Sequence, residues 1–466
     1  MTEPAAPAND VAGRSALGRN VLWTYGDVVV GIVTQLVQIG YAARTLGRSG
    51  YGVFALVVSL VLVLTALQFC FSLTVQAAAS RIVTGTEQPG DRSNIVASHA
   101  ALSGCGWFAF LAGDISALVL AIGKPAIPGG AKDVAWLVLL MTASAAVGFL
   151  CATAAGVVRG ATQYRTASLA SSGGRLVTLV IVLALLRPWG IAALGVATLA
   201  GQLVTNVVLV QKARTIAPWL RMLPQRVSRP ALRQVGTIAA PLLVVSIGQQ
   251  VVAATDLVAI SAIIGAATTA LYQLGSTLPN RALLALFQGY DVVFPYLAGG
   301  SSAARQERDA RTVSRLFAYL GGLGFGLLIA FRTPLDEALA GSHVHSGLSD
   351  TVLVLFSVAC MVNTGVHGIA LLAISLSNVI ALPLLLRGKL GSIPFTFPIT
   401  DGLIPSGLGF GIAFGFGLPI SQAVAGIGGF GLAVPAVLVV GAGLAYVGLG
   451  ERRQTFVHVL LHPPSD

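Results

Sequence analysis

The chain has 466 residues, of which 55% are hydrophobic and only 10% are charged. An average soluble domain carries roughly 25% charged residues, and the mean hydropathy of this chain is +0.84. This composition excludes a soluble enzyme, a disordered chain and a secreted disulfide scaffold, and it leaves a polytopic membrane protein. The four cysteines lie in apolar runs without the spacing of metal ligands, so they are interpreted as small core residues.

Twelve apolar runs are candidate membrane helices, since a spanning helix needs about 20 mostly apolar residues. They are centred on residues 20–43, 52–80, 95–122, 134–157, 165–186, 189–211, 234–262, 270–298, 312–331, 351–378, 380–420 and 426–449. Glycines and prolines interrupt the eleventh run, which is therefore read as a re-entrant segment, a broken helix or two short spans. The fold class predicted is all-α, with two pseudo-symmetric six-helix bundles.

The net charge of +11 is explained by the excess of Lys and Arg in cytoplasmic loops rather than by a nucleic-acid partner. With a cytoplasmic N-terminus, 20 basic residues fall in cytoplasmic segments and 6 in outer loops. This asymmetry predicts a multi-pass protein of the plasma (inner) membrane with both termini cytoplasmic. The most basic loop, residues 212–233, has six positive residues and no acid.

That loop lies midway along the chain and predicts that the chain consists of two halves. Weak sequence matches between the halves support this division. Leu46-Gly47 matches Ile264-Gly265 between the first two helices of each half, and Gly190-Ile191 matches Gly426-Ile427 near the end of each half. Parallel repeats of this kind occur in transporters that bind substrate between their halves. The predicted segments are a disordered tail at 1–18, bundles at 19–213 and 233–450, a linker at 214–232 and a cytoplasmic tail at 451–466.

Polar residues inside the apolar runs form stripes on the first two helices of each half. Helical spacing places on one face Asp27, Gly31, Thr34 and Gln38; Thr65, Gln68, Ser72 and Gln76; Ser246, Gln249 and Asp256; and Gln273, Thr277, Arg281, Gln288 and Asp291. Four such stripes, if they face one another, would line one hydrated cavity. The alternative is that Ser, Thr and Gln only join helices by hydrogen bonds.

Charged residues within a bilayer are costlier, and Arg281 at mid-span costs about 2.5–3.5 kcal/mol on insertion scales. We therefore expect Arg281 to face the cavity, with a structural ion pair as the alternative. Arg175 is either a functional cation or a helix-packing partner. The sequence contains neither a phosphate loop nor a metal-ligand cluster, so no cofactor, metal site or ATP-driven step is expected.

One turn carries a family resemblance. The run Asn20-Val21-Leu22-Trp23, followed by an R-x-L-G-x-x-x-Y-G-x-F pattern from Arg44 to Phe54, resembles the opening of bacterial polysaccharide and O-antigen flippases. These belong to the superfamily that also holds MATE drug exporters and the lipid II flippase. Ala240-Pro241, Asp256, Gly265 with Tyr272, and Phe294-Pro295 agree with it. The resemblance covers residues 18–335, and residues 388–425 depart from it.

The resemblance implies that a polyprenyl-diphosphate-linked oligosaccharide is flipped from the cytoplasmic to the outer leaflet by alternating access, for cell-surface polysaccharide synthesis. It implies a cavity made by the first, second, seventh and eighth helices, and a glycan polymerase as a partner. Arginine can grip the diphosphate, while Asp27 and Asp256 are candidates for coupling the flip to a gradient of H+ or Na+. Asp291 and Arg175 are further candidate residues of this cavity.

Two other functions stay open. A MATE-like exporter of cationic or amphipathic small molecules would use the acids for substrate and ion. A non-transporting scaffold, or a membrane enzyme of glycan assembly, would pair its intramembrane charges with each other and leave no cavity.

Overall fold

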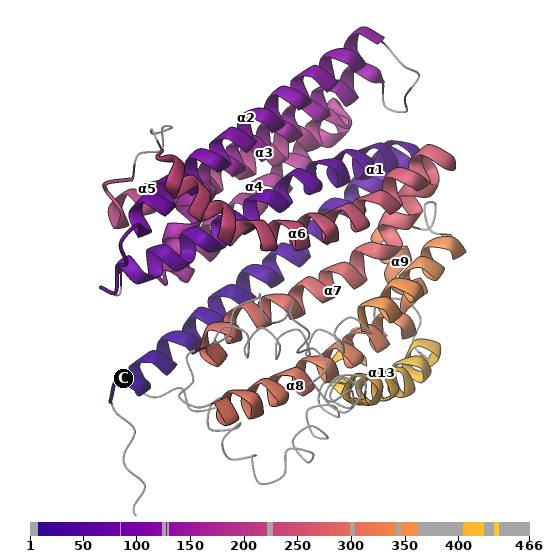
Figure 1. The fold of residues 1–466 in the computed structure, drawn as a ribbon. Coiled ribbons are helices and arrows are strands. Elements are labelled where there is room, and N and C mark those ends of the chain that lie inside the picture. The colour runs from indigo at the N-terminus through magenta and orange to yellow at the C-terminus, as the bar shows by residue number, and fades with distance from the viewer. Residues whose placement is uncertain are drawn as a thin grey trace, which may run out of the picture. The chain divides into compact units, whose positions relative to one another are not determined.

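The computed structural model describes residues 8–83, 85–123, 127, 130–220, 227–298, 303–341, 346–361, 404–423 and 433–437. Every regular element in these residues is a helix, as the composition predicts (Figure 1). Five helices are long and apolar enough to cross a membrane by themselves, and a bent pair adds a sixth. The all-α, polytopic membrane class is therefore confirmed for this part of the chain.

Within the described residues, the helices follow the predicted apolar runs. They are α1 Ala8–Val83, α2 Asp91–Gly123, α3 Ala131–Gly160, α4 Tyr164–Trp189, α5 Ala192–Ile216, α6 Arg229–Ile263, α7 Ala266–Ala298, α8 Ala303–Ala330, α9 Arg332–Ala340 and α13 Ile404–Ala423, with a further helix at Gly347–Met361. α1 begins inside the stretch for which a disordered tail was predicted. Residues 362–403, which hold the end of the tenth run and the first part of the ambiguous eleventh, lie outside the described residues. So do most of the twelfth run, 426–449, and the predicted match at Gly426-Ile427.

Glycines at two equivalent positions break the chain between helices. Gly47 (φ 68°) interrupts α1 and separates its two predicted spans, while Gly265 (φ 115°) separates α6 from α7. Both backbone angles lie in the left-handed region, which only glycine adopts at little cost. The matched dipeptides Leu46-Gly47 and Ile264-Gly265 therefore both end in a glycine that breaks the chain between helices.

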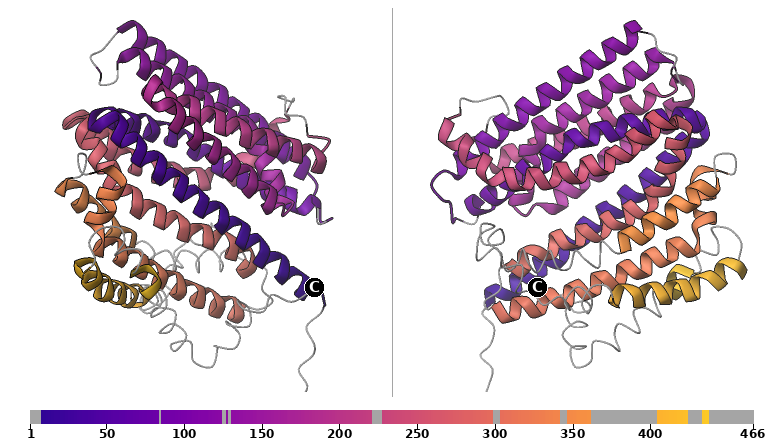
Figure 2. Two further views of the ribbon diagram at one scale, coloured as in Figure 1. Left: turned by 180° about the vertical axis from the view of Figure 1, so that it is seen from behind. Right: turned by 45° about the vertical axis from the view of Figure 1, so that its right-hand side comes forward.

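Contacts group the chain into two compact units, Gly26–Gln273 and Met1–Tyr25 with Leu274–Asp466. In the first unit, α2 packs on α3, α3 on α5, and α4 on α5 (Figure 2). α3 is its central helix, because 56% of its apolar window is buried, against 22–39% for the other spans. The division of the chain into two six-helix bundles joined by a linker at 214–232 stays a prediction.

The second unit has its core where α8 packs against α13. Phe325, Phe331 and Leu353 are fully buried there together with Ala413. α8 and α9 are bent by 75° at Phe331, and α9 lies in a segment that the sequence had placed in an outer loop. Buried Asp336 accepts a hydrogen bond from Ser349 at the start of the next helix.

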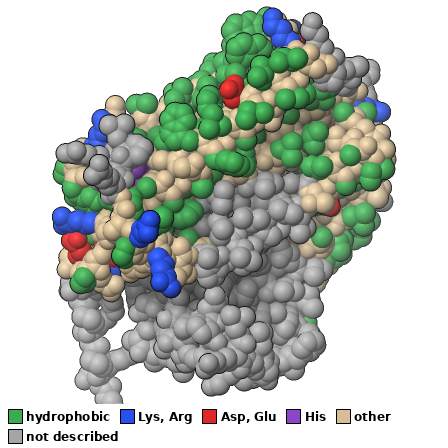
Figure 3. All heavy atoms as spheres, turned by 45° about the horizontal axis from the view of Figure 1, so that its top comes forward, with side chains coloured by type: hydrophobic (Ala, Val, Ile, Leu, Met, Phe, Trp, Pro, Cys, Tyr) green, Lys and Arg blue, Asp and Glu red, His purple; other side chains and the backbone are tan. Residues whose placement is uncertain are grey.

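Large apolar side chains also cover much of the outside. On α2 the exposed residues include Trp107, Phe108, Ile115 and Ile122, and Figure 3 shows green hydrophobic side chains over much of the coloured part of the face turned to the viewer. An aqueous surface does not carry such a continuous apolar covering, whereas a lipid-facing surface requires it.

Candidate functional site

An ion pair joins α1 and α4 within the first unit. Arg175 Nη1 donates to the backbone oxygen of Asp27 at 2.6 Å and to its Oδ1 at 3.0 Å. Ser172, one turn earlier on α4, donates to the same Oδ1 at 2.8 Å. Both residues lie in candidate membrane spans, so each charge compensates the other in a medium that penalises an isolated ion.

A glycine provides the space for this pair. A Cβ on Gly31 would overlap the Arg175 guanidinium, and Gly31 stands one turn after Asp27 on the same face of α1. The helical face predicted from Asp27, Gly31, Thr34 and Gln38 therefore includes the residue that makes room for a cation from another helix. The lack of a side chain at Gly31 is therefore a feature of the site.

This contact occupies only part of the hydrogen-bonding capacity of the guanidinium. Both hydrogen bonds to Asp27 come from the single atom Nη1, and the Arg175 side chain is 41% exposed, against 17% for Asp27. Among the residues that the structure describes, Nη2 and Nε of Arg175 have no recorded acceptor. An end-on pair of this kind can hold a carboxylate on one side and present N–H donors on the other.

Two glutamines of the second stripe bond to neighbouring helices. Gln68 Nε2 donates to the backbone oxygen of Gly148 on α3 at 3.0 Å, and Gln76 Nε2 donates to the hydroxyl of Tyr164 on α4 at 3.2 Å. These contacts favour the alternative in which the stripe joins helices. Their place in a cavity stays a prediction.

Asp256 has a partner from the next helix. The Tyr272 hydroxyl donates to Asp256 Oδ2 at 2.7 Å, linking α6 to α7 across the turn at Gly265. The Asp256 side chain is exposed, and Tyr272 is half-buried. The carboxylate is thus oriented by a phenol, while its surface stays open to an ion.

The other predicted site residues are only partly placed. Gln38, Gln273 and Arg281 are half-buried on α1 and α7. Gln249, Gln288 and Asp291 lie in α6 and α7, but their side chains lie outside the described ones. A cavity lined by all four stripes stays a prediction.

The sequence reading missed a buried polar column on α2. His99 is fully buried and shares a hydrogen bond of 3.2 Å with Thr153 on α3. Asn94 and Ser98 are buried beside it. The signal was the spacing Asp91, Asn94 and Ser98, which places three polar residues on one helical face at the start of the apolar run.

Neither a protein-family model nor any curated protein matches this sequence. Solved structures do match its fold. A multidrug-resistance MATE transporter of the MOP superfamily, in an inward-facing conformation, aligns with a TM-score of 0.55 at 17% identity over 84% of this chain and 95% of that chain. A MOP-superfamily transporter from Pyrococcus furiosus, described as having a binding pocket of reverse polarity, aligns with a TM-score of 0.52 at 17% identity over 91% and 96%.

The lipid II flippase MurJ, in an inward closed conformation, aligns with a TM-score of 0.49 at 13% identity, over 95% of this chain and 96% of that chain. The two higher-scoring matches are both structures of transporters. Their alignments cover most of both chains, so this chain has the fold of MOP-superfamily transporters.

Proposed function

We propose that this protein is a plasma-membrane flippase that moves a polyprenyl-diphosphate-linked oligosaccharide from the cytoplasmic to the outer leaflet. The observation that carries this proposal is the partly exposed guanidinium of Arg175 inside a membrane-spanning bundle. A diphosphate carries at least two negative charges into an apolar slab and needs a cation there. Hydroxyl and amide side chains of the polar stripes suit the sugars, and the lipid tail can stay in the bilayer.

The pair with Asp27 gives this cation a means of control. Asp27 competes with the substrate for Arg175, and an ion that binds Asp27 in place of the guanidinium would leave the arginine to the diphosphate. Asp27 and Asp256 are the proposed ion-coupling residues, with H+ or Na+ as the ion. The cycle then alternates between an arginine held by carboxylate and an arginine held by diphosphate.

Cells depleted of the protein test the proposal directly. Lipid-linked glycans are extracted, and their leaflet is determined with a membrane-impermeant sugar-modifying reagent. We expect an intact oligosaccharide-diphospholipid to accumulate on the cytoplasmic face, and wild-type protein to restore its export. Unchanged amount and sidedness of these lipids, in a strain with no second flippase, would show that the proposal is wrong.

Complementation separates the role of Arg175 from charge in general. Arg175→Gln is expected to fail, and Arg175→Lys to restore export in part, because lysine keeps the charge without the planar donor array. Arg187→Gln, at the exposed end of the same helix, is the matched control and is expected to restore export fully.

A second candidate is export of small amphipathic cations, which the likeness to multidrug MATE structures favours. In that case the acids contact the substrate and the arginines do not. Arg281→Ala would then preserve transport while Asp256→Asn abolishes it. The flippase proposal expects both variants to be impaired, and fluorescent-cation efflux alongside the glycan assay distinguishes the two functions.

A further inference from the structure

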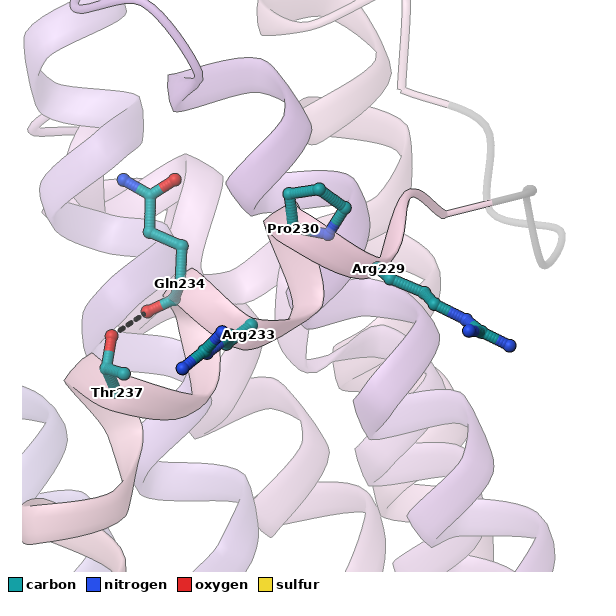
Figure 4. Close-up of a pocket in the computed structure, with 5 residues that line it drawn as sticks. All are labelled: Arg229, Pro230, Arg233, Gln234 and Thr237. Carbon is teal, nitrogen blue, oxygen red and sulfur yellow. Dashed lines mark hydrogen bonds between the residues drawn. The ribbon is translucent and has the colours of Figure 1, made fainter.

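A shallow pocket opens beside the first two turns of α6. Arg229, Pro230, Arg233, Gln234 and Thr237 line it, and Figure 4 shows Arg229 and Arg233 extending from successive turns of the helix. Ser228 caps the helix by accepting from the amide of Ala231, while buried Ala231 and Val235 pack against Ala97 of α2. The inward face of α6 is therefore fixed, and the arginines stand on the outward one.

The acids of the neighbouring loop between α1 and α2 already have partners. The loop between α1 and α2 approaches it, since Gly90 lies close to Gln234. In that loop Asp91 is held by Arg81 through Nε at 3.0 Å and Nη2 at 2.5 Å, and Glu87 is held by Arg92 at 2.8 Å.

No acid occurs in the sequence between residues 134 and 255. In the described part of the chain, neither Arg229 nor Arg233 takes part in an ion pair. The pocket thus carries two positive charges that no acid among the described residues neutralises.

Its position selects the class of ligand. The apolar span of α6 follows directly after Thr237, and Leu232, between the two arginines, is exposed. By the predicted orientation the pocket faces the cytoplasmic leaflet, whose anionic lipids attract basic residues at the membrane boundary. Here the guanidinium groups can meet a phosphate while an acyl chain follows the apolar side of the helix.

We infer that this pocket binds the phosphate headgroup of an anionic phospholipid of the cytoplasmic leaflet, with Arg229 and Arg233 as its ligands. The lipid is a structural partner and not cargo, because none of the residues that line the pocket belongs to the polar stripes of the proposed substrate cavity. The site is independent of the transported substrate, so it stands or falls separately from the proposed function.

The test is lipid binding by the full-length protein in neutral detergent, followed by native mass spectrometry with added phosphatidylglycerol or phosphatidylcholine. We expect phosphatidylglycerol to bind preferentially, and the double variant R229Q/R233Q to bind it about 25-fold more weakly, since each basic residue near an anionic lipid contributes about fivefold. K132Q/R187Q, which removes two exposed positive charges from the predicted outer side, is the charge-matched control and is expected to bind like wild type.

Three results would overturn the inference. The first is equal loss of phosphatidylglycerol in R229Q/R233Q and in the control. The second is equal retention of both phospholipids. The third is displacement of the bound lipid by polyprenyl diphosphate or inorganic phosphate at equimolar concentration, which would assign the pocket to cargo or to a free anion.

Discussion

Gly52 lies directly against the carbonyl oxygen of Ala266, so that a Cβ on Gly52 would overlap that oxygen. Gly52 follows the break at Gly47, and Ala266 follows the break at Gly265. The segments that follow the two breaks therefore touch through their backbones, and Tyr51, beside Gly52, is 2% exposed.

The first prediction concerns this contact. Gly52→Val should lower the stability of the folded protein by about 1–3 kcal/mol, because overpacking forces the two backbones apart. Apparent Tm in detergent, followed by tryptophan fluorescence, measures the loss. Gly26→Ala, also on α1 but with open space around it, should leave the Tm unchanged or slightly higher; an equal drop in both would contradict the role of the contact.

The second prediction concerns the ion pair of α1 and α4. Arg175→Gln and Asp27→Asn should each destabilise the protein by about 1–3 kcal/mol, since each leaves a partly buried charge without its partner. The double variant should lose less than the sum of the two. Thermal unfolding of all four proteins completes the double-mutant cycle, and strict additivity would show that the side chains do not interact in the membrane.

The third prediction uses the space at Gly31. Gly31→Leu should displace the Arg175 guanidinium and impair export as Arg175→Gln does, although it removes no charge. Gly173→Ala, on α4 with open space around its Cα, is the control and should export normally. Full export by Gly31→Leu, at normal abundance in the membrane, would argue against a fixed position for the guanidinium.

The fourth prediction concerns the loop between α1 and α2. Arg81→Ala should be destabilising by about 2–4 kcal/mol, because Asp91 is only 2% exposed and would be left as a buried, uncompensated carboxylate. Glu87→Gln breaks the exposed pair with Arg92 and should change stability by about 0–1 kcal/mol. Chemical unfolding in mixed micelles compares them, and similar losses in both would mean that burial of Asp91 is unimportant.

The fifth prediction concerns Tyr272. Tyr272→Phe removes the hydroxyl that donates to Asp256 and should slow ion-coupled transport severalfold without abolishing it, while Asp256→Asn abolishes it. Transport by reconstituted protein under an imposed gradient measures both. The same rate with and without a gradient in wild type would exclude coupling through this carboxylate.

Most of the helices could be predicted because an apolar run of membrane length has few other stable conformations. The break at Gly47 was also predictable, since the motif repeats at Gly265. The partnership of Arg175 with Asp27 was not, because 148 residues separate them and helical periodicity does not tell which neighbour a face meets. α9 was missed because nine residues with an Arg, an Asp and a Glu give no apolar signal.

The separation of Asp27 from Arg175 also has a consequence for how the protein is made. α1 enters the membrane with its carboxylate well before α4 has been synthesised, so nascent chains pass through a stage in which Asp27 has no cation from α4. A chain that stops after α3 retains that charge in its first span. Until α4 is in place, this uncompensated carboxylate makes the first span costly to hold in the bilayer.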